Sequence, residues 1–496
     1  MDKDSLRKEG EMKKRSVTAT LALSTAAAVI GSSFQFGYNT GVINNPQSVI
    51  QQFMNETGEQ RSGEWMDDTK VTLLWSTAVA IFAVGGVIGS LSAGAIADKF
   101  GRKRALLLNN VLAVLAAILM GFSKLANSYE MLIIGRLVIG VNCGINTGIV
   151  PMYLSEISPV NLRGGIGVLH QLAVTSGILI SQILGLPVVL GTSELWPVLL
   201  GLTVAPTVFQ LFTLPFCKES PRYLLISQKK EFEAKKALVW LCKDDDVSDM
   251  IQEMQSEYEE ENKEERMSIA KLLKDSSLRM PLIISVVLQL SQQLSGINAV
   301  LYYSTSIFIE AGVDEDKSPY VTLSTGAIMV IMTVVSIPLM DRLGRKTLHM
   351  FGLGFMLFWA IFLTVFLSIA WSGAAYGSII CVMLFTVGFA IGPGSIPWLI
   401  VSELFSQGPR PAAVSVAFMV NWGANFLVGL LFPFMLDGLN EYVFVVFIVL
   451  LAVFFLFTWK FLPETKNKSF EEISALFKKN EARHYEVEAN MDLKKI

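Results

Sequence analysis

The sequence predicts an all-α membrane protein whose twelve transmembrane helices form two pseudo-symmetric six-helix bundles. Hydrophobic residues make up 52% of the 496 residues and charged residues only 17%, whereas a soluble domain carries roughly a quarter. Apolar stretches of about 20 residues, long enough to cross a bilayer, recur along the whole chain. Short charged motifs of the first half return in the second half, in the same order.

The chain opens with polar and basic residues that are followed directly by a long apolar segment. This order predicts a cytoplasmic N-terminus over 1–16 and then a first spanning helix, rather than a cleavable signal peptide. Twelve spans are predicted near 17–43, 71–97, 104–124, 130–152, 164–188, 195–216, 281–309, 319–340, 347–369, 376–402, 412–436 and 440–462.

A hydrophilic segment separates the sixth span from the seventh. Runs rich in Glu and Lys at 231–240 and 249–265 favour short helices there. The predicted organisation is an N-terminal six-helix bundle (17–217), a cytoplasmic helical linker (218–279), a C-terminal six-helix bundle (280–462) and a cytoplasmic tail (463–496).

Basic residues in the short loops set the orientation. They follow the second, fourth, eighth and tenth spans, on the side of both termini, and an excess of Lys and Arg marks the cytoplasmic side. The loop at 44–70 lies on the other side, is acidic, and holds the sequon Asn55-Glu56-Thr57. Asn55 is therefore a predicted glycosylation site, and we expect a multi-pass protein of the plasma membrane.

The two halves repeat each other at intervals of about 245 residues. Asp98-Lys-Phe-Gly-Arg-Lys recurs as Asp341-Arg-Leu-Gly-Arg-Lys, and Glu156 with Arg163 recurs as Glu403 with Arg410. Such an ordered repeat indicates a duplicated six-helix unit, the architecture of a transporter in which two bundles rock about a central site.

The repeated charges lie at the cytoplasmic ends of spans. Ion pairs there can hold a transporter open to the outside and release when the bundles part. The alternative is that these charges only fix topology and extend to the membrane interface; we favour the latch. The predicted latch residues are Arg102, Glu156, Arg163, Glu219, Arg222, Arg345, Glu403, Arg410 and Glu464.

Side-chain amides recur inside the predicted spans. Gln171, Thr175 and Gln182 share one stripe of the fifth span, and Asn421 and Asn425 are one turn apart in the eleventh. The seventh span carries Gln289, Gln292 and Gln293 and then Asn298, which joins the face of Gln289 and Gln293 only if the helix loosens near Gly296.

Amides are costly in hydrocarbon unless they face a partner or a wet cavity. Each donates and accepts hydrogen bonds, as vicinal sugar hydroxyls do, and Trp398 and Trp422 can cover the apolar face of a sugar ring. The alternative is that the amides join helices to one another. Their number, in both halves, favours a polar cavity.

The tenth span contains Gly392, Pro393 and Pro397. Proline removes backbone donors, so this span is expected to be broken. The break is either a gate element beside a binding site or a static kink, and the sequence favours neither.

These motifs resemble the animal facilitative glucose transporter family, in the sugar porter branch of the major facilitator superfamily. The resemblance rests on Gly101-Arg-Lys, Pro151-Met-Tyr-Leu-Ser-Glu156, Gln289-Leu-Ser-Gln-Gln-Leu-Ser-Gly-Ile-Asn298 and Gly392-Pro-Gly-Ser-Ile-Pro-Trp398. It implies the major facilitator fold and passive transport of a hexose, foremost D-glucose, by alternating access. The residues it places around the sugar are Gln171, Gln292, Gln293, Asn298, Phe389, Trp398, Trp422 and Asn425, with Tyr302 and Tyr303 as an extracellular gate; Gln289 joins them by position.

Three positions depart from the glucose pattern of that family. Met329, Ala390 and Leu301 stand where its glucose carriers usually have Asn, Glu and Phe. Ala390 is similar to the fructose-preferring branch. A fructose-preferring transporter is therefore the alternative to a glucose transporter.

Coupling to protons depends on Asn39 and Arg136. Related proton-coupled sugar symporters have Asp at the position of Asn39, and an amide cannot titrate as a carboxylate does. We expect a uniporter; a symporter and a non-transporting sugar sensor are the alternatives.

The remaining polar residues indicate no other chemistry. With only His170, His349 and His484 and no metal-ligand spacing, the sequence predicts no enzyme, metal site or cofactor. The hexose and the lipid bilayer are the expected partners, nucleic acid is not, and protein partners are not indicated. No disulfide is expected.

Overall fold

The computed structural model describes residues 15–264, 267–369, 373–466, 468 and 472–473. Helices account for the regular structure of these residues, and no strand occurs among them. The predicted N-terminus (1–16) and tail (463–496) lie for the most part outside the described residues. Eleven stretches are long and apolar enough to cross a membrane. One of them, Arg410–Phe461, contains two helices, so twelve spans result.

The six spans of the N-terminal bundle follow the predicted segments. The first is continuous through α2 (Ala19–Ala28), the π-helical η1 (Val29–Phe34) and α3 (Gln35–Gly41), and the sixth comprises α9 (Trp196–Gly201), α10 (Val204–Thr213) and η2 (Leu214–Phe216). The four between them are α5 (Asp68–Phe100), α6 (Arg102–Gly121), α7 (Tyr129–Ile157) and α8 (Val160–Leu184).

Two spans of the C-terminal bundle are interrupted. The seventh is α14 (Arg279–Gln293) and α15 (Ile297–Glu310), which meet at Gly296 with φ +100°, a conformation that favours glycine. The tenth is α18 (Ala374–Ile391) and α19 (Ile396–Leu404). The other four are α16 (Ser318–Leu343), α17 (Arg345–Ser368), α20 (Arg410–Leu439) and α21 (Val443–Phe461), with the turn η5 (Asn440–Tyr442) between the last two.

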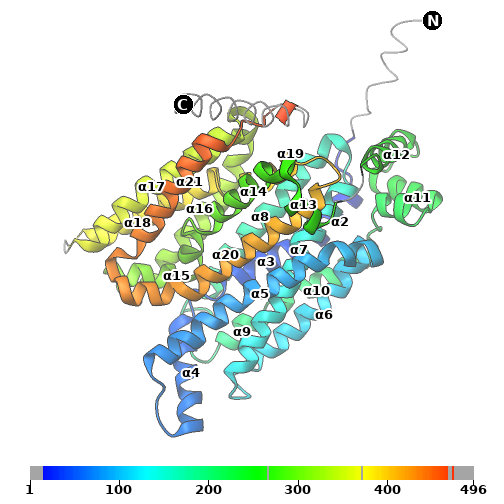
Figure 1. The fold of residues 1–496 in the computed structure, drawn as a ribbon. Helices are drawn as coiled ribbons and strands as arrows, with labels where there is room; N and C mark the ends of the chain where they lie inside the picture. The colour runs from blue at the N-terminus through cyan, green and yellow to red at the C-terminus, as the bar shows by residue number, and fades with distance from the viewer. Residues whose placement is uncertain (1–14, 265–266, 370–372, 467, 469–471, 474–496) are drawn as a thin grey trace, which may run out of the picture.

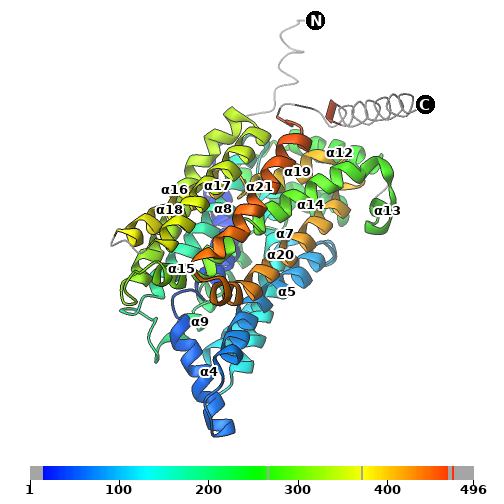
Figure 2. The same cartoon turned by 60° about the vertical axis from the view of Figure 1, so that its left-hand side comes forward.

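The two bundles lie side by side (Figures 1 and 2). They meet chiefly where α20 packs along α5 and where α16 packs along α8. Small residues permit the first contact: Gly86 of α5 lies against the ring of Trp422 in α20, and Gly429 of α20 lies against Ala80.

The molecule has two distinct ends. At one end, here called the terminal face, lie residues 98–104, 158–163, 341–346 and 405–410 together with the linker helices. At the other, the α4 face, lies α4 (Gln47–Ser62), at the bottom of Figure 1. The sequence predicts a loop here, whereas the structure has a helix with Ile50, Phe53, Met54 and Thr57 buried on one face.

The described part of the linker forms three α-helices, together with the π-helical turn η3 (Tyr223–Ser227) and the 3-10 turn η4 (Ser276–Leu278). The predicted runs are helical over α11 (Glu231–Cys242) and α12 (Ser248–Asn262), and a third helix, α13 (Ile269–Lys274), follows; residues 265–266 lie outside the described residues. Thr20 Oγ1 donates to the Trp240 carbonyl at 2.7 Å, which ties α11 to the N-terminal bundle. α13 packs on α14 and α20 of the C-terminal bundle. The predicted domain boundaries remain predictions.

Candidate functional site

Asn421 lies at the centre of a hydrogen-bonded cluster of amides. Its Nδ2 donates to Gln289 Oε1 at 2.7 Å and to Gln292 Oε1 at 2.6 Å. Its Oδ1 accepts from Gln293 Nε2 at 2.9 Å. Asn421 was noted in the sequence beside Asn425 but not assigned to the site, and it joins α20 to all three glutamines of α14.

The cluster extends into α15. Gln293 Oε1 accepts from the Nδ2 groups of Asn298 and, at 3.4 Å, of Asn425. The break at Gly296 turns Asn298 onto the face of Gln293, as the sequence required. Tyr302 Oη then donates to Asn425 Oδ1 at 3.0 Å. The predicted gate tyrosine is thus joined directly to the amides.

Gln292 connects the cluster to the broken tenth span. Pro397 has no N–H, so the carbonyl of Pro393, four residues earlier, lacks its helical donor. Gln292 Nε2 donates instead to the carbonyls of Pro393 and Gly394, both at 2.8 Å. The break and the amides therefore form one bonded unit.

The amides of the cluster differ in how much of their surface solvent can reach. Gln293 and Asn425 keep 9% and 8% of their surface exposed, whereas Gln289 is at 0% and its Nε2 has no partner among the described residues. A water-sized group can therefore reach Gln293 and Asn425. Because each amide here bonds mainly to other amides, an entering hydroxyl has to exchange with these bonds.

Aromatic rings border the same region. Trp422 is packed between Phe36 and Phe82 of the N-terminal bundle, with ring centroids 5.8 Å away in both cases. Trp398 is partly exposed, with its ring 5.1 Å from that of Phe418, and Phe389 is buried.

The N-terminal bundle contributes α8. Thr175 Oγ1 accepts from Thr333 Oγ1 at 3.5 Å, and Gln182 Nε2 donates to Thr325 Oγ1 at 3.2 Å, so the predicted stripe faces α16. Gln171, one turn from Thr175, is partly exposed, and its side chain makes no hydrogen bond with a described residue. It is not part of the amide cluster, although its amide is free to bind a ligand.

Uncharged hydrogen bonds join the two bundles at the α4 face. Asn44 Nδ2 donates to Ser304 Oγ at 2.7 Å and to the Leu301 carbonyl at 2.9 Å, and Thr305 Oγ1 donates to Asn45 Oδ1 at 3.2 Å. Tyr303, the second predicted gate residue, donates to the Gly429 carbonyl at 2.7 Å. α3 and α15 are closed on each other at this end.

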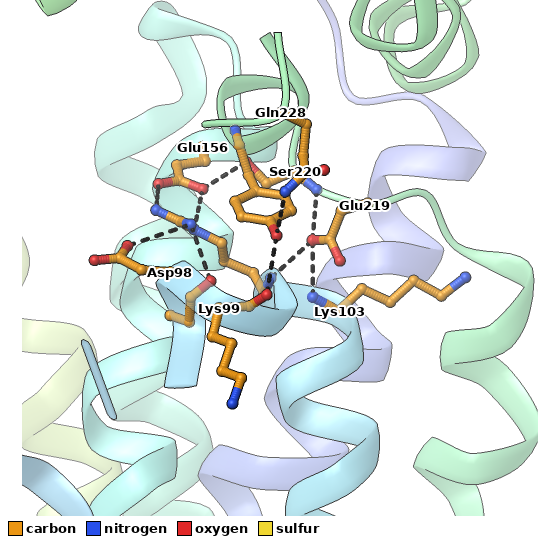
Figure 3. A network of polar contacts seen from close by, with 10 residues as sticks. Asp98, Lys99, Lys103, Glu156, Glu219, Ser220 and Gln228 are labelled. Atoms are coloured by element: carbon orange, nitrogen blue, oxygen red, sulfur yellow. Dashed lines mark hydrogen bonds and ion pairs between the residues drawn. The ribbon is translucent and has the colours of Figure 1, made fainter. Parts of the chain in front are cut away.

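At the terminal face an ion cluster lies within the N-terminal bundle (Figure 3). Arg102 Nη2 donates to Glu156 Oε1 at 2.9 Å, and Ser220 Oγ donates to the same carboxylate. Glu219 Oε1 accepts the backbone N–H groups of Arg102 and Lys103, each at 2.9 Å. An anion there neutralises the positive N-terminus of α6.

The C-terminal bundle repeats this cluster residue for residue. Arg345 Nε donates to Glu403 Oε1 at 3.1 Å, and Thr465 takes the place of Ser220. Glu464 accepts the backbone N–H groups of Arg345 at 2.9 Å and Lys346 at 3.1 Å, at the N-terminus of α17. The sequence repeat is therefore also a structural repeat.

The other predicted latch residues have different partners. Arg163 and Arg222 pair with Glu257 of α12, at 3.5 and 2.7 Å. Burial raises the pKa of neighbouring Glu253 above its ordinary value, against the opposing charge of Arg163. Arg410 donates to the Phe405 carbonyl. The pairs Arg102–Glu156 and Arg345–Glu403 each lie within one bundle.

Arg136 is buried without a carboxylate partner among the described residues. Its Nη1 donates to the backbone carbonyl of Asn39 at 2.8 Å, and its guanidinium lies 4.6 Å from the ring of Phe82. The Asn39 side chain does not bind Arg136: its Nδ2 donates to Gln35 O and Thr203 Oγ1, and its Oδ1 has no hydrogen-bond partner among the described residues.

Asn55 lies in α4 rather than in a loop. Its Oδ1 accepts from the Met66 N–H at 2.9 Å, and Thr57 of the sequon is buried. Glycosylation of Asn55, which is partly exposed, remains a prediction.

Two six-helix bundles with matching ion clusters at one end define a two-bundle membrane transporter. The chain belongs to the sugar (and other) transporter family, whose profile matches residues 24–477. Facilitated glucose transporter member 3 of solute carrier family 2 from Bos taurus is 51% identical over 464 residues, 93% of either chain. The Homo sapiens protein of that name is 50% identical over 468 residues, 94% of either chain.

Solved structures show the same fold. The partially occluded inward-open form of the xylose transporter XylE from E. coli matches with a TM-score of 0.77 and 24% identity, over 91% of this chain and 100% of that one. Its inward-open form also matches with a TM-score of 0.77. The predicted fold class is confirmed.

Proposed function

We propose that this chain carries hexoses, D-glucose foremost, passively across the plasma membrane by alternating access. The observation that carries the proposal is the amide cluster of α14, α15 and α20, bonded both to a gate tyrosine and to the broken tenth span. Gln171 of α8 would complete the site from the opposite bundle. The named relatives, at about half identity over almost the whole chain, are facilitated glucose transporters.

The chemistry of the cluster suits a hexose. Each amide offers both a donor and an acceptor, which neighbouring hydroxyls of a sugar require. Trp398, which is partly exposed, supplies a flat apolar surface for the C–H face of the ring, whereas Trp422 would have to leave its packing against Phe36 and Phe82 to do so. Exchange of amide–amide bonds for amide–hydroxyl bonds costs little, which suits a carrier that has to release its substrate.

Alternating access follows from how the two ends are held. Neutral hydrogen bonds close the α4 face, whereas the ion clusters of the terminal face are satisfied inside each bundle. We assign the α4 face to the outside and the terminal face to the cytoplasm, so this conformation is closed to the outside. In the opposite state Glu156, Glu403 and their arginines would bind across the bundles as the latch.

Passive transport is supported by the absence of a mid-span acid. None of the twelve spans carries Asp or Glu in its central part, and the position next to Arg136 is held by the amide Asn39. An amide does not titrate, so neither Asn39 nor a mid-span carboxylate is available to load a proton on one side and release it on the other.

A fructose preference is the second candidate. Leu301, Met329 and Ala390 are all buried, so each offers only apolar contact. A glucose carrier of this family usually has an aromatic, an amide and a carboxylate there. Loss of those polar groups weakens recognition of particular hydroxyls by about 1 kcal/mol per hydrogen bond.

Counterflow in proteoliposomes tests the function. Vesicles loaded with unlabelled glucose should accumulate labelled glucose transiently, and a non-transporting sensor would give no such uptake. Competition by galactose and fructose in the same vesicles ranks the substrates. Stronger competition by fructose than by glucose would establish the second candidate instead.

A further inference from the structure

His349 is a buried histidine that the proposed function does not use. It lies in the second turn of α17, is fully buried, and has its Nε2 3.1 Å from Ser291 Oγ of α14. α17 carries none of the candidate sugar-binding residues. The contact joins α17 to α14, which carries three of the amides.

The hydrogen bond has a defined direction. Ser291 has one hydroxyl proton, and Ser291 Oγ donates it to the Leu288 carbonyl at 2.7 Å. With that proton directed at the carbonyl, we assign Nε2 of the histidine as the donor to Ser291 Oγ, which in the neutral imidazole leaves Nδ1 unprotonated. Nδ1 has no hydrogen-bond partner among the described residues.

Ser291 lies on the reverse of the amide face. It is two residues from both Gln289 and Gln293, or about 200° around the helix from each. A bond that holds Ser291 consequently sets the rotation of α14 about its axis. That rotation decides how Gln289 and Gln293 point at Asn421.

The same turns of α17 support the broken tenth span. A Cβ on Gly352 would lie 2.7 Å from the Gly388 carbonyl, and one on Gly392 would lie 2.7 Å from the Leu348 carbonyl. Only glycine permits this approach. α17 therefore contacts the start of the break directly, one turn from His349.

These contacts close a ring of three elements. Gln292 joins α14 to the break at Pro393 and Gly394, Gly352 and Gly392 join the break to α17, and His349 joins α17 back to α14. We propose that His349 is a positioning residue of the sugar site, acting through Ser291 to fix the rotation of α14 relative to the break. The inference rests on the proposed function.

The test measures the half-saturating glucose concentration in counterflow and the melting temperature of each purified variant. His349→Leu and Ser291→Ala should each raise half-saturation about three- to tenfold. His349→Gln should stay within about twofold of the unmodified chain, because a glutamine Nε2 can donate at similar reach. The double variant should be no worse than the worse single one.

Asn109→Leu is the matched control. Asn109 Nδ2 donates to the Asn142 carbonyl at 3.0 Å and to Asn146 Oδ1 at 2.8 Å, a buried contact between α6 and α7 away from the amides. It should lower the melting temperature and leave half-saturation unchanged. If His349→Leu does not fold, Ser291→Ala, which removes only a hydroxyl, tests the same hydrogen bond.

Three results would overturn the inference. One is a His349→Leu protein that melts earlier but keeps normal half-saturation, as the control does. Another is full additivity of His349→Leu and Ser291→Ala. The third is the same half-saturation change in His349→Gln as in His349→Leu. Absence of glucose counterflow in the unmodified chain would instead refute the proposed function itself.

Discussion

Single side chains divide into those that hold the fold and those that are left for a ligand. Asn421 makes three hydrogen bonds to glutamines of α14 and belongs to the first group. Gln171 makes none with a described residue, so its retention in a membrane helix needs another reason. The sequence predicted Gln171, Gln293 and Asn425 as one site; the structure joins the last two, and sugar binding by any of them remains a prediction.

Gln171→Ala should separate binding from folding. Because the amide of Gln171 has no partner to lose, the melting temperature should hardly change. The half-saturating glucose concentration should rise about fivefold if one hydrogen bond to the sugar is lost. Counterflow of the purified variant measures this; unchanged affinity would place Gln171 outside the site.

Asn39→Asp tests whether transport is passive, because it replaces one amide nitrogen by a carboxylate oxygen. An aspartate beside Arg136 introduces a carboxylate, which the central parts of the spans lack. Transport by the variant should then vary between neutral and mildly acidic pH, while the unmodified chain shows no such dependence. A pH-independent Asn39→Asp protein would show that this position does not govern coupling.

The transmembrane helices could be predicted from the sequence, but several contacts between helices could not. All twelve spans follow from apolar stretches and proline or glycine breaks. The sequence predicts a loop over 44–70, whereas α4 forms there because its apolar residues recur at helical spacing. The pairing of Arg163 and Arg222 with α12 could not be foreseen, since a sequence does not say where an amphipathic linker helix docks.

Pro397→Ala tests whether the break in the tenth span is a working element. An alanine N–H would compete with Gln292 for the Pro393 carbonyl and favour a continuous helix. Maximal exchange should fall severalfold, with a smaller change in half-saturation. Normal exchange by a folded variant would make the break a static kink.

Glu403→Gln tests the latch. The variant loses the charge that pairs with Arg345 but keeps the shape of the side chain. Turnover should change more than half-saturation, because the cluster lies at the terminal face and not beside the amides. Equal changes in both would argue against a latch. Asp314→Asn, at an exposed pair with Lys317 on the other face, is the control.

On the scale of the whole molecule, duplication of a six-helix unit explains why the two bundles share the same ion cluster. The same ion cluster caps α6 in one bundle and α17 in the other, so the two halves can rotate as similar rigid bodies. The amide cluster departs from this symmetry: it lies entirely in the C-terminal bundle. A substrate that bridges it to α8 would make binding depend on both bundles, which is what alternating access requires.

The central claim is that this two-bundle protein equilibrates a hexose without using a proton gradient. Proteoliposomes with an imposed gradient, alkaline inside, should take up labelled glucose until the inside concentration equals the outside concentration, and a protonophore should leave that plateau unchanged. A plateau well above the outside concentration that collapses with the protonophore would contradict the account.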